Sequence, residues 1–145
     1  SKDEKTIAND TDAEEKAYQQ VKDELGFDMP RLRYLPEGTK FKEVTISQKS
    51  QMATVSYLYN EKVISYGAVA SYQDRVFGKD IEDKWENKYT TAVDGMSVTI
   101  NQYQVQDTGE LEFTAQFQCS DIQYYLLGVM KQKEFDEIVK NLRVF

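Results

Sequence analysis

The sequence predicts an α+β fold, in which a single antiparallel β-sheet of about six to seven strands is flanked by an N-terminal and a C-terminal amphipathic helix. Apolar residues recur at helical spacing near both ends of the chain, and apolar and polar residues alternate through its middle. The alternating stretches are joined by short turns, which favour antiparallel neighbours over crossover connections. The 145 residues are 40% hydrophobic, which is enough for one domain with its own core.

The N-terminal helix is predicted over residues 12–25. Thr11 and Glu14 have the spacing of a capping box at its start, and Gly26 fits its end. Its apolar stripe consists of Ala13, Ala17, Tyr18, Val21 and Leu25.

The first eleven residues are polar, and Ile7 is their one aliphatic side chain larger than alanine. We expect residues 1–11 to form a disordered tether or frayed end, followed by a single domain over 12–145. The chain opens at Ser1 without an initiator methionine, as expected of a processed or shortened product.

Strand patterns and tight turns fill the middle of the chain. The expected strands are 44–47, 53–59, 62–72, 89–93, 96–105, 111–119 and 122–128. Tight reversals are expected at Asn60-Glu61, Asp94-Gly95 and Ser120-Asp121, the Asp-Gly pair being the strongest hairpin signal. A phase change along 96–105 predicts a bulge near Asn101 and Gln102.

The last element is a helix, because Phe135, Ile138, Val139 and Leu142 have the spacing i, i+3, i+4 and i+7. Cys119 lies in phase with Phe113 and Phe117 on the 111–119 strand, so we expect a buried thiol.

Composition excludes several classes of function. The net charge of −7 has the wrong sign for a general nucleic-acid binder, and the absence of histidine excludes a histidine-dependent triad or a histidine-ligated metal. We expect no catalytic residue, no metal and no cofactor. The acidic residues of the cluster Asp80–Glu86 alternate with lysines and form a solvated face in this interpretation, the alternatives being a weak divalent-ion site or catalytic carboxylates.

Aromatic residues mark the best candidate for recognition. Residues 73–88 are predicted to be an irregular loop, and a long loop inside a small domain is often functional. We expect ligand-binding residues in and beside it: Tyr72, Arg75, Phe77, Trp85 and Tyr89. In the alternative interpretation Trp85 packs back on the sheet and contributes stability alone. Arg31 and Arg33 either pair with acidic neighbours or bind an anionic partner.

Several motifs, in chain order, resemble a bacterial family of domains of unknown function, number 4367. They are Leu25-Gly26-Phe27, Tyr34-Leu35-Pro36-Glu37-Gly38, Phe41-Lys42-Glu43-Val44, Val55–Tyr59, Val93-Asp94-Gly95, Ile122–Gly128 and Lys133–Ile138. They are similar to the turns and to the ends of strands and helices in the family, and they carry no chemistry. Cys119-Ser120-Asp121 departs from the pattern, since a tryptophan is expected before the last strand.

The resemblance implies an exported domain, because such domains typically form the outer part of a Gram-positive lipoprotein or single-pass membrane protein. We therefore expect a non-catalytic extracytoplasmic binding or sensing domain, with a peptide, protein or cell-envelope ligand. Contact with the membrane would come only through an upstream anchor absent from this chain. The alternatives are a structural or adaptor module without a ligand and a carboxylate-based enzyme.

Overall fold

The computed structural model describes residues 2–70 and 85–143, with side chains over 12–70 and 87–143. The elements in chain order are α1 (Lys2–Leu25), β1 (Lys40–Ser47), β2 (Met52–Tyr59), β3 (Lys62–Ala70), β4 (Trp85–Val93), β5 (Met96–Gln104), β6 (Leu111–Cys119), β7 (Ile122–Val129) and α2 (Gln132–Lys140).

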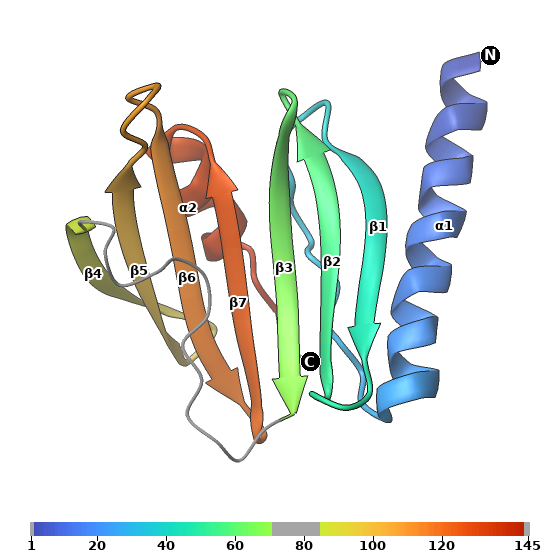
Figure 1. The fold of residues 1–145 in the computed structure, drawn as a ribbon. Helices are drawn as coiled ribbons and strands as arrows, with labels where there is room; N and C mark the ends of the chain where they lie inside the picture. Colours follow the sequence, from blue (N-terminus) through green and yellow to red (C-terminus); the bar gives the residue numbers. More distant parts are fainter. Residues whose placement is uncertain (1, 71–84, 144–145) are drawn as a thin grey trace.

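The seven strands of the described residues belong to one sheet in the order β1-β2-β3-β7-β6-β5-β4 (Figure 1). Every neighbouring pair is antiparallel, so the sheet consists of two meanders joined where β3 pairs with β7. The α+β prediction is confirmed, with seven strands and one helix near each end of the chain. The described edge strands are β1 and β4.

The three predicted hairpin turns are confirmed by their backbone conformations. Asn60 and Glu61, Asp94 and Gly95, and Ser120 and Asp121 all have positive φ, between 50° and 80°. Two consecutive residues of this kind form the turn whose twist matches the twist of the flanking strands. The registers of β2–β3, β4–β5 and β6–β7 therefore follow from local sequence.

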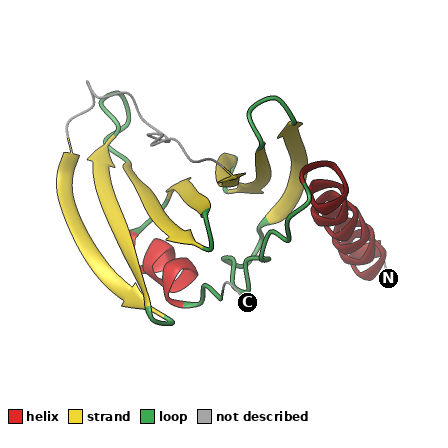
Figure 2. Ribbon diagram, turned by 90° about the horizontal axis from the view of Figure 1, so that it is seen from below, coloured by secondary structure: helices red, strands yellow, loops and turns green. Residues whose placement is uncertain are grey.

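Both helices lie on the same face of the sheet. Tyr57 and Tyr59 are two residues apart on β2, and their hydroxyls reach α1 and α2 respectively. Helix α1 packs beside β1 and β2, and α2 packs under β6, with the link from α1 to β1 between them (Figure 2). This face, called here the helix face, holds the core.

Large aromatic side chains fill the core across several strands. Phe113 and Phe135, both fully buried, stack at 5.2 Å between ring centroids and join β6 to α2. Tyr124 stacks on Phe117 at 5.1 Å and on Tyr66 at 6.5 Å. On α1 the buried apolar residues are Ala17, Tyr18, Val21 and Leu25, four of the five predicted.

Helix α1 begins at Lys2, ten residues before the predicted start, so Thr11 and Glu14 do not mark the start of the helix. The predicted end is correct, because Gly26 has a φ of 80° and its N–H bonds to the carbonyl of Lys22.

Strand β4 begins at Trp85, so Trp85–Lys88 are not part of a loop. The remainder of the predicted loop lies outside the described residues. The bulge predicted in the 96–105 strand lies instead in β4, where Trp85 faces Tyr103 and Asn87 faces Gln102. The phase change in β5 arises because both of its faces are buried: Val98 and Ile100 on one, Asn101 and Tyr103 on the other.

Cys119 is half-buried, so the expectation of a fully buried thiol is corrected. It lies at the end of β6, next to the turn at Ser120, where little of the core surrounds it. Among the described residues, no helix is long and apolar enough to cross a bilayer.

Candidate functional site

The structure places some of the predicted site residues. Tyr72, Arg75 and Phe77 lie outside the described residues, as do most of the acidic cluster Asp80–Glu86. The backbone of Trp85 opens β4 and pairs with Tyr103. Tyr89 is described in full.

Tyr89 lies on β4 opposite Ile100, on the helix face, and its side chain is half-buried. Its hydroxyl donates to Asp136 Oδ1 at 2.9 Å and accepts from Gln132 Nε2 at 3.3 Å. Burial raises the pKa of the Tyr89 phenol above its usual range, so this hydroxyl keeps its proton at neutral pH. Tyr89 therefore joins β4 to α2.

A cavity of about 490 Å³ opens beside Tyr89, and we call it the β4–α2 groove. This volume is within the range of small-ligand sites. Its lining residues are Tyr89, Thr90, Thr91, Ala92, Val93, Asp94, Ile100, Asp136, Val139, Lys140 and Arg143. Val93, Ile100 and Val139 are buried and form an apolar floor, while charged and hydroxyl-bearing side chains form the rim.

Two cations belong to the rim at the C-terminal end of α2. The Lys140 side chain is 75% exposed, and its Nζ lies 3.7 Å from Glu137 Oε1. Arg143 Nη1 donates to the backbone carbonyls of Leu142 at 2.6 Å and Lys140 at 3.4 Å. Within residues 12–70 and 87–143, no carboxylate pairs with Arg143. The groove therefore combines an apolar floor with positive charge available to a ligand.

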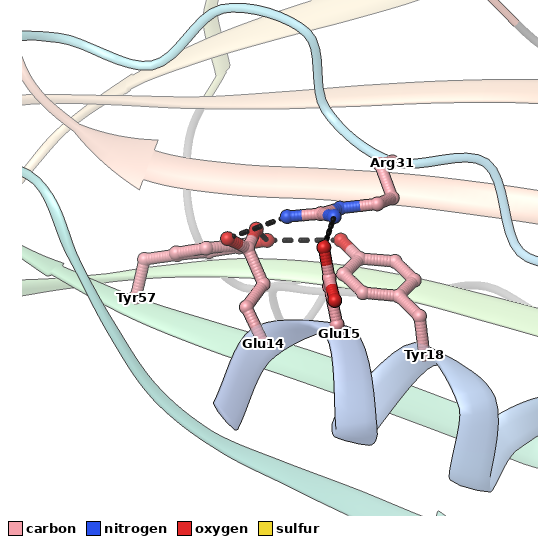
Figure 3. Close-up of polar contacts among 5 residues, drawn as sticks. All are labelled: Glu14, Glu15, Tyr18, Arg31 and Tyr57. Atoms are coloured by element: carbon pink, nitrogen blue, oxygen red, sulfur yellow. Dashed lines mark hydrogen bonds and ion pairs between the residues drawn. The ribbon is translucent and has the colours of Figure 1, made fainter. Parts of the chain in front are cut away.

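A second polar constellation joins α1, the link after it and β2 (Figure 3). Glu14 accepts from the Tyr57 hydroxyl at 2.6 Å and pairs with Arg31 Nη2 at 2.8 Å. The Tyr57 proton is used toward Glu14, so at 2.9 Å the Tyr18 hydroxyl must donate to Tyr57. The Arg31 guanidinium also lies over the Tyr18 ring, 5.4 Å from its centroid. The prediction that Arg31 pairs with acidic neighbours is confirmed.

This constellation stabilises the fold and offers no reactive group. Burial raises the pKa of both Tyr18 and Tyr57 far above the usual phenol range, so both stay protonated as donors. Nearby, the Tyr66 hydroxyl donates to the carbonyl of Pro30 at 2.5 Å. These tyrosines fix α1 and its link to the sheet.

Sequence reasoning missed most of the groove. It selected Tyr89 for its place beside the predicted loop, but not Thr91, Asp136, Lys140 or Arg143. The partners of the Tyr89 hydroxyl are 43 and 47 residues away in the chain, and no local pattern indicates them. The available signal was the two basic residues, Lys140 and Arg143, on either side of Leu142 at the end of the last apolar stripe. In the described part of the chain, no cluster of three or more acidic or cysteine residues could hold a metal ion.

The fold and the groove define a small α+β domain with one sheet, helices on one face and a ligand-sized cavity at the sheet edge. The chain belongs to the family described as Domain of unknown function (DUF4367), whose model matches residues 29–142. The match includes all seven strands and α2, and it begins after α1. No curated protein and no solved structure matches the chain.

Proposed function

We propose that this protein is a non-catalytic extracytoplasmic binding or sensing domain of a membrane-anchored bacterial protein, and that its ligand occupies the β4–α2 groove. The observation that carries the proposal is the groove itself, with its apolar floor of Val93, Ile100 and Val139 and its charged rim. Ligand sites combine such a floor for affinity with a few polar groups for orientation. The exported setting is supported by the resemblance of the sequence to exported domains of Gram-positive bacteria.

The groups that line the groove support binding rather than reaction. The Tyr89 phenol holds its proton, and Asp136 is engaged as its acceptor. With no histidine in the chain, a general base of the commonest type is missing from the sequence. Recognition through shape and charge is therefore the function that we assign to this site.

The test is nuclear magnetic resonance titration of the full chain with two probe classes: solubilised peptidoglycan and teichoic-acid fragments, and short linear peptides. We expect saturable shifts of the amides of residues 89–94 and 136–140 with one class. Thr91→Trp, on the helix face inside the groove, should abolish them, because the new ring fills the cavity. Ser97→Trp, exposed on β5 outside the groove, is the matched control and should leave them unchanged.

Other outcomes contradict the proposal. If neither probe class gives saturable shifts, or if the shifts fall elsewhere and persist in Thr91→Trp, the groove is not a binding site. The adaptor alternative would then be favoured. The location is tested in the source cells by whether a protease added to intact cells degrades the domain, and protection would contradict the exported setting.

A further inference from the structure

Strand β4 ends the sheet with one edge that no described strand pairs with. Between Tyr89 and Val93 this edge carries no charge and no proline. Proteins usually protect sheet edges with charges, prolines, bulges or a covering element, because free N–H and C=O groups pair readily with another chain. The segment 89–93 lacks the first three devices, since the bulge of β4 lies at its other end, near Trp85.

The other edge shows how this protein protects a strand. Strand β1 carries Lys40, Lys42 and Glu43 and has a bulge between Phe41 and Glu43. Helix α1 also packs alongside it (Figure 1). The two edges of the sheet therefore differ, and the edge segment without charge, proline or bulge, residues 89–93, borders the groove.

The hairpin fixes which backbone groups of β4 point outward. Val93 and Met96 flank the two-residue turn, so they exchange both of their backbone hydrogen bonds, and alternate pairs do the same along the ladder. Thr91 and Tyr89 therefore direct their N–H and C=O groups toward β5. Thr90 and Ala92 direct theirs to the free edge.

The groove and the free edge form one surface. Thr90 and Ala92 face Thr99 and Ser97 across the ladder, and the side chains of that register lie away from the helix face. They nevertheless line the groove, so the cavity reaches their backbone at the edge. A chain lying along β4 would send alternate side chains over the floor of Val93 and Val139.

The charged side chains on the groove rim indicate the chemistry of the partner. The protein carries a net charge of −7, and the groove rim holds the cations Lys140 and Arg143 together with the carboxylates of Asp94 and Asp136. Asp136 on the same rim already accepts from Tyr89, and Arg143 donates to backbone carbonyls alone within the described side chains. The positive end of the groove is complementary to a carboxylate.

We propose that the β4–α2 groove binds an extended peptide segment of a partner protein, which pairs with the free edge of β4 as an added strand. This inference rests on the proposed function and names its ligand class. The segment carries an aliphatic side chain over the apolar floor and an acidic side chain, two residues away along the strand, toward Lys140 and Arg143. Main-chain hydrogen bonds supply affinity in this mode, and the alternate side chains supply specificity.

The probe is a display library of short linear peptides, selected on the full chain, with binding of the enriched peptides measured by fluorescence anisotropy. We expect enriched sequences in which an aliphatic and an acidic residue are two positions apart. Thr90→Pro removes an outward N–H and leaves the bonds to β5 intact, and proline is tolerated on an edge strand. It should weaken binding by about tenfold or more. Thr99→Ala, on β5 opposite Thr90 and outside the groove lining, is the control and should stay within about twofold.

A second pair of variants tests the charge. Arg143→Glu should lower the affinity for the acidic peptides by about tenfold, because a charge complementary to the peptide is replaced by a like charge. It should also reduce the salt dependence of binding. Lys133→Glu makes the same charge change on an exposed position of α2 outside the groove, so it should have little effect. This pair also decides the matter if Thr90→Pro fails to fold.

Each alternative outcome has a separate meaning. Full binding by folded Thr90→Pro, or by Arg143→Glu, overturns the strand-addition proposal. If no peptide is enriched and envelope fragments shift the amides of the groove, the strand-addition proposal is overturned. The proposed function then stands. A dimer of the wild-type chain that Thr90→Pro dissolves would identify a second copy as the occupant and overturn the partner peptide.

Discussion

Several tyrosine hydroxyls join separate elements of this protein. The Tyr57 ring is buried in the core, and its hydroxyl reaches Glu14 on α1. The Tyr66 hydroxyl donates to the carbonyl of Pro30 in the link after α1, and the Tyr89 hydroxyl donates to Asp136 on α2. Tyrosine suits this role because its ring packs in the core and its hydroxyl forms a directional hydrogen bond to the neighbouring element. Within the described part of the chain, these three tyrosines therefore have architectural roles.

Replacing Tyr57 by phenylalanine tests this role. The ring stays, but Glu14 loses a donor and the Tyr18 hydroxyl loses its acceptor. A hydrogen bond to a charged group contributes about 1.5–3 kcal/mol, so the melting midpoint should fall by about 5–9 °C. Thermal unfolding of wild type and Tyr57→Phe, followed by circular dichroism, measures it. An unchanged midpoint would show that water replaces the hydroxyl without loss.

Buried phenols also predict a loss of stability in alkali. Burial raises the pKa of Tyr124 to about 12. A phenol whose pKa is higher in the folded state contributes stability that is complete below its unfolded pKa of about 10 and is lost as the pH rises through the folded value. The free energy of unfolding should therefore fall between about pH 10 and pH 12. Tyr124→Phe, which keeps the stacked ring, should lose less stability over that range, and equal losses would contradict the assignment.

Gly67 is required by the ring of Tyr125. A Cβ at position 67 would lie 1.9 Å from Tyr125 Cε1, and the Tyr125 hydroxyl is fixed by a 2.6 Å hydrogen bond to Thr54. Gly67→Ala should therefore cost about 1–3 kcal/mol by overpacking. In a Tyr125→Ala background the same change should cost far less, which a double-mutant cycle measures. Equal costs in both backgrounds would place the effect in the backbone.

At the level of elements, the sequence predicted what depends on neighbouring residues. The hairpin turns, the alternating strands and the apolar stripe of α2 each follow from a few consecutive side chains. The pairing of β3 with β7 and the position of α2 beside β4 depend on contacts between distant residues, and no local pattern specifies them. The start of β4 was missed because Trp85–Lys88 are mostly charged or polar and contain the bulge of the strand. The groove was missed because it forms between β4 and α2, which are far apart in the sequence, and it exists only when both are in place.

The hypothesis that Trp85, at the start of β4, is a recognition residue stays a prediction. It shares a register position with Tyr103, which lies away from the helix face, whereas Tyr89 lies on it. A partner that runs along the edge of β4 is adjacent to both faces, so it could contact both positions. Trp85→Ala should then weaken capture of the selected peptides by about tenfold and leave the melting point unchanged. A loss of many degrees would instead identify Trp85 as a packing residue, and the hypothesis would be discarded.

At the scale of the whole molecule, α1 lies outside the matched family region and yet completes its core. The match begins at residue 29, whereas Tyr18, Val21 and Leu25 of α1 are buried in the same cluster as the sheet. Glu14 adds the polar contacts to Tyr57 and Arg31. The helix face of β1 and β2 therefore depends on a segment that precedes the family region.

This dependence predicts opposite results for two truncations. The contacts of α1 that build the core come from Tyr18, Val21 and Leu25, with Glu14 adding polar contacts, whereas residues 1–11 are polar and have one aliphatic side chain larger than alanine. Removing residues 1–11 should therefore leave the thermal midpoint within about 2 °C, which is less than about 1 kcal/mol for a chain of this size. Removing residues 1–27 should abolish cooperative unfolding although the family region stays intact, because the helix face of β2 loses its cover. Val21→Asp in the full chain should be similarly damaging, since it places a charge at a fully buried position.

Calorimetry of the three variants tests both expectations. A large fall of the thermal midpoint without residues 1–11 would give these residues a role in the core. Cooperative melting without residues 1–27 would make α1 an addition to an independent domain.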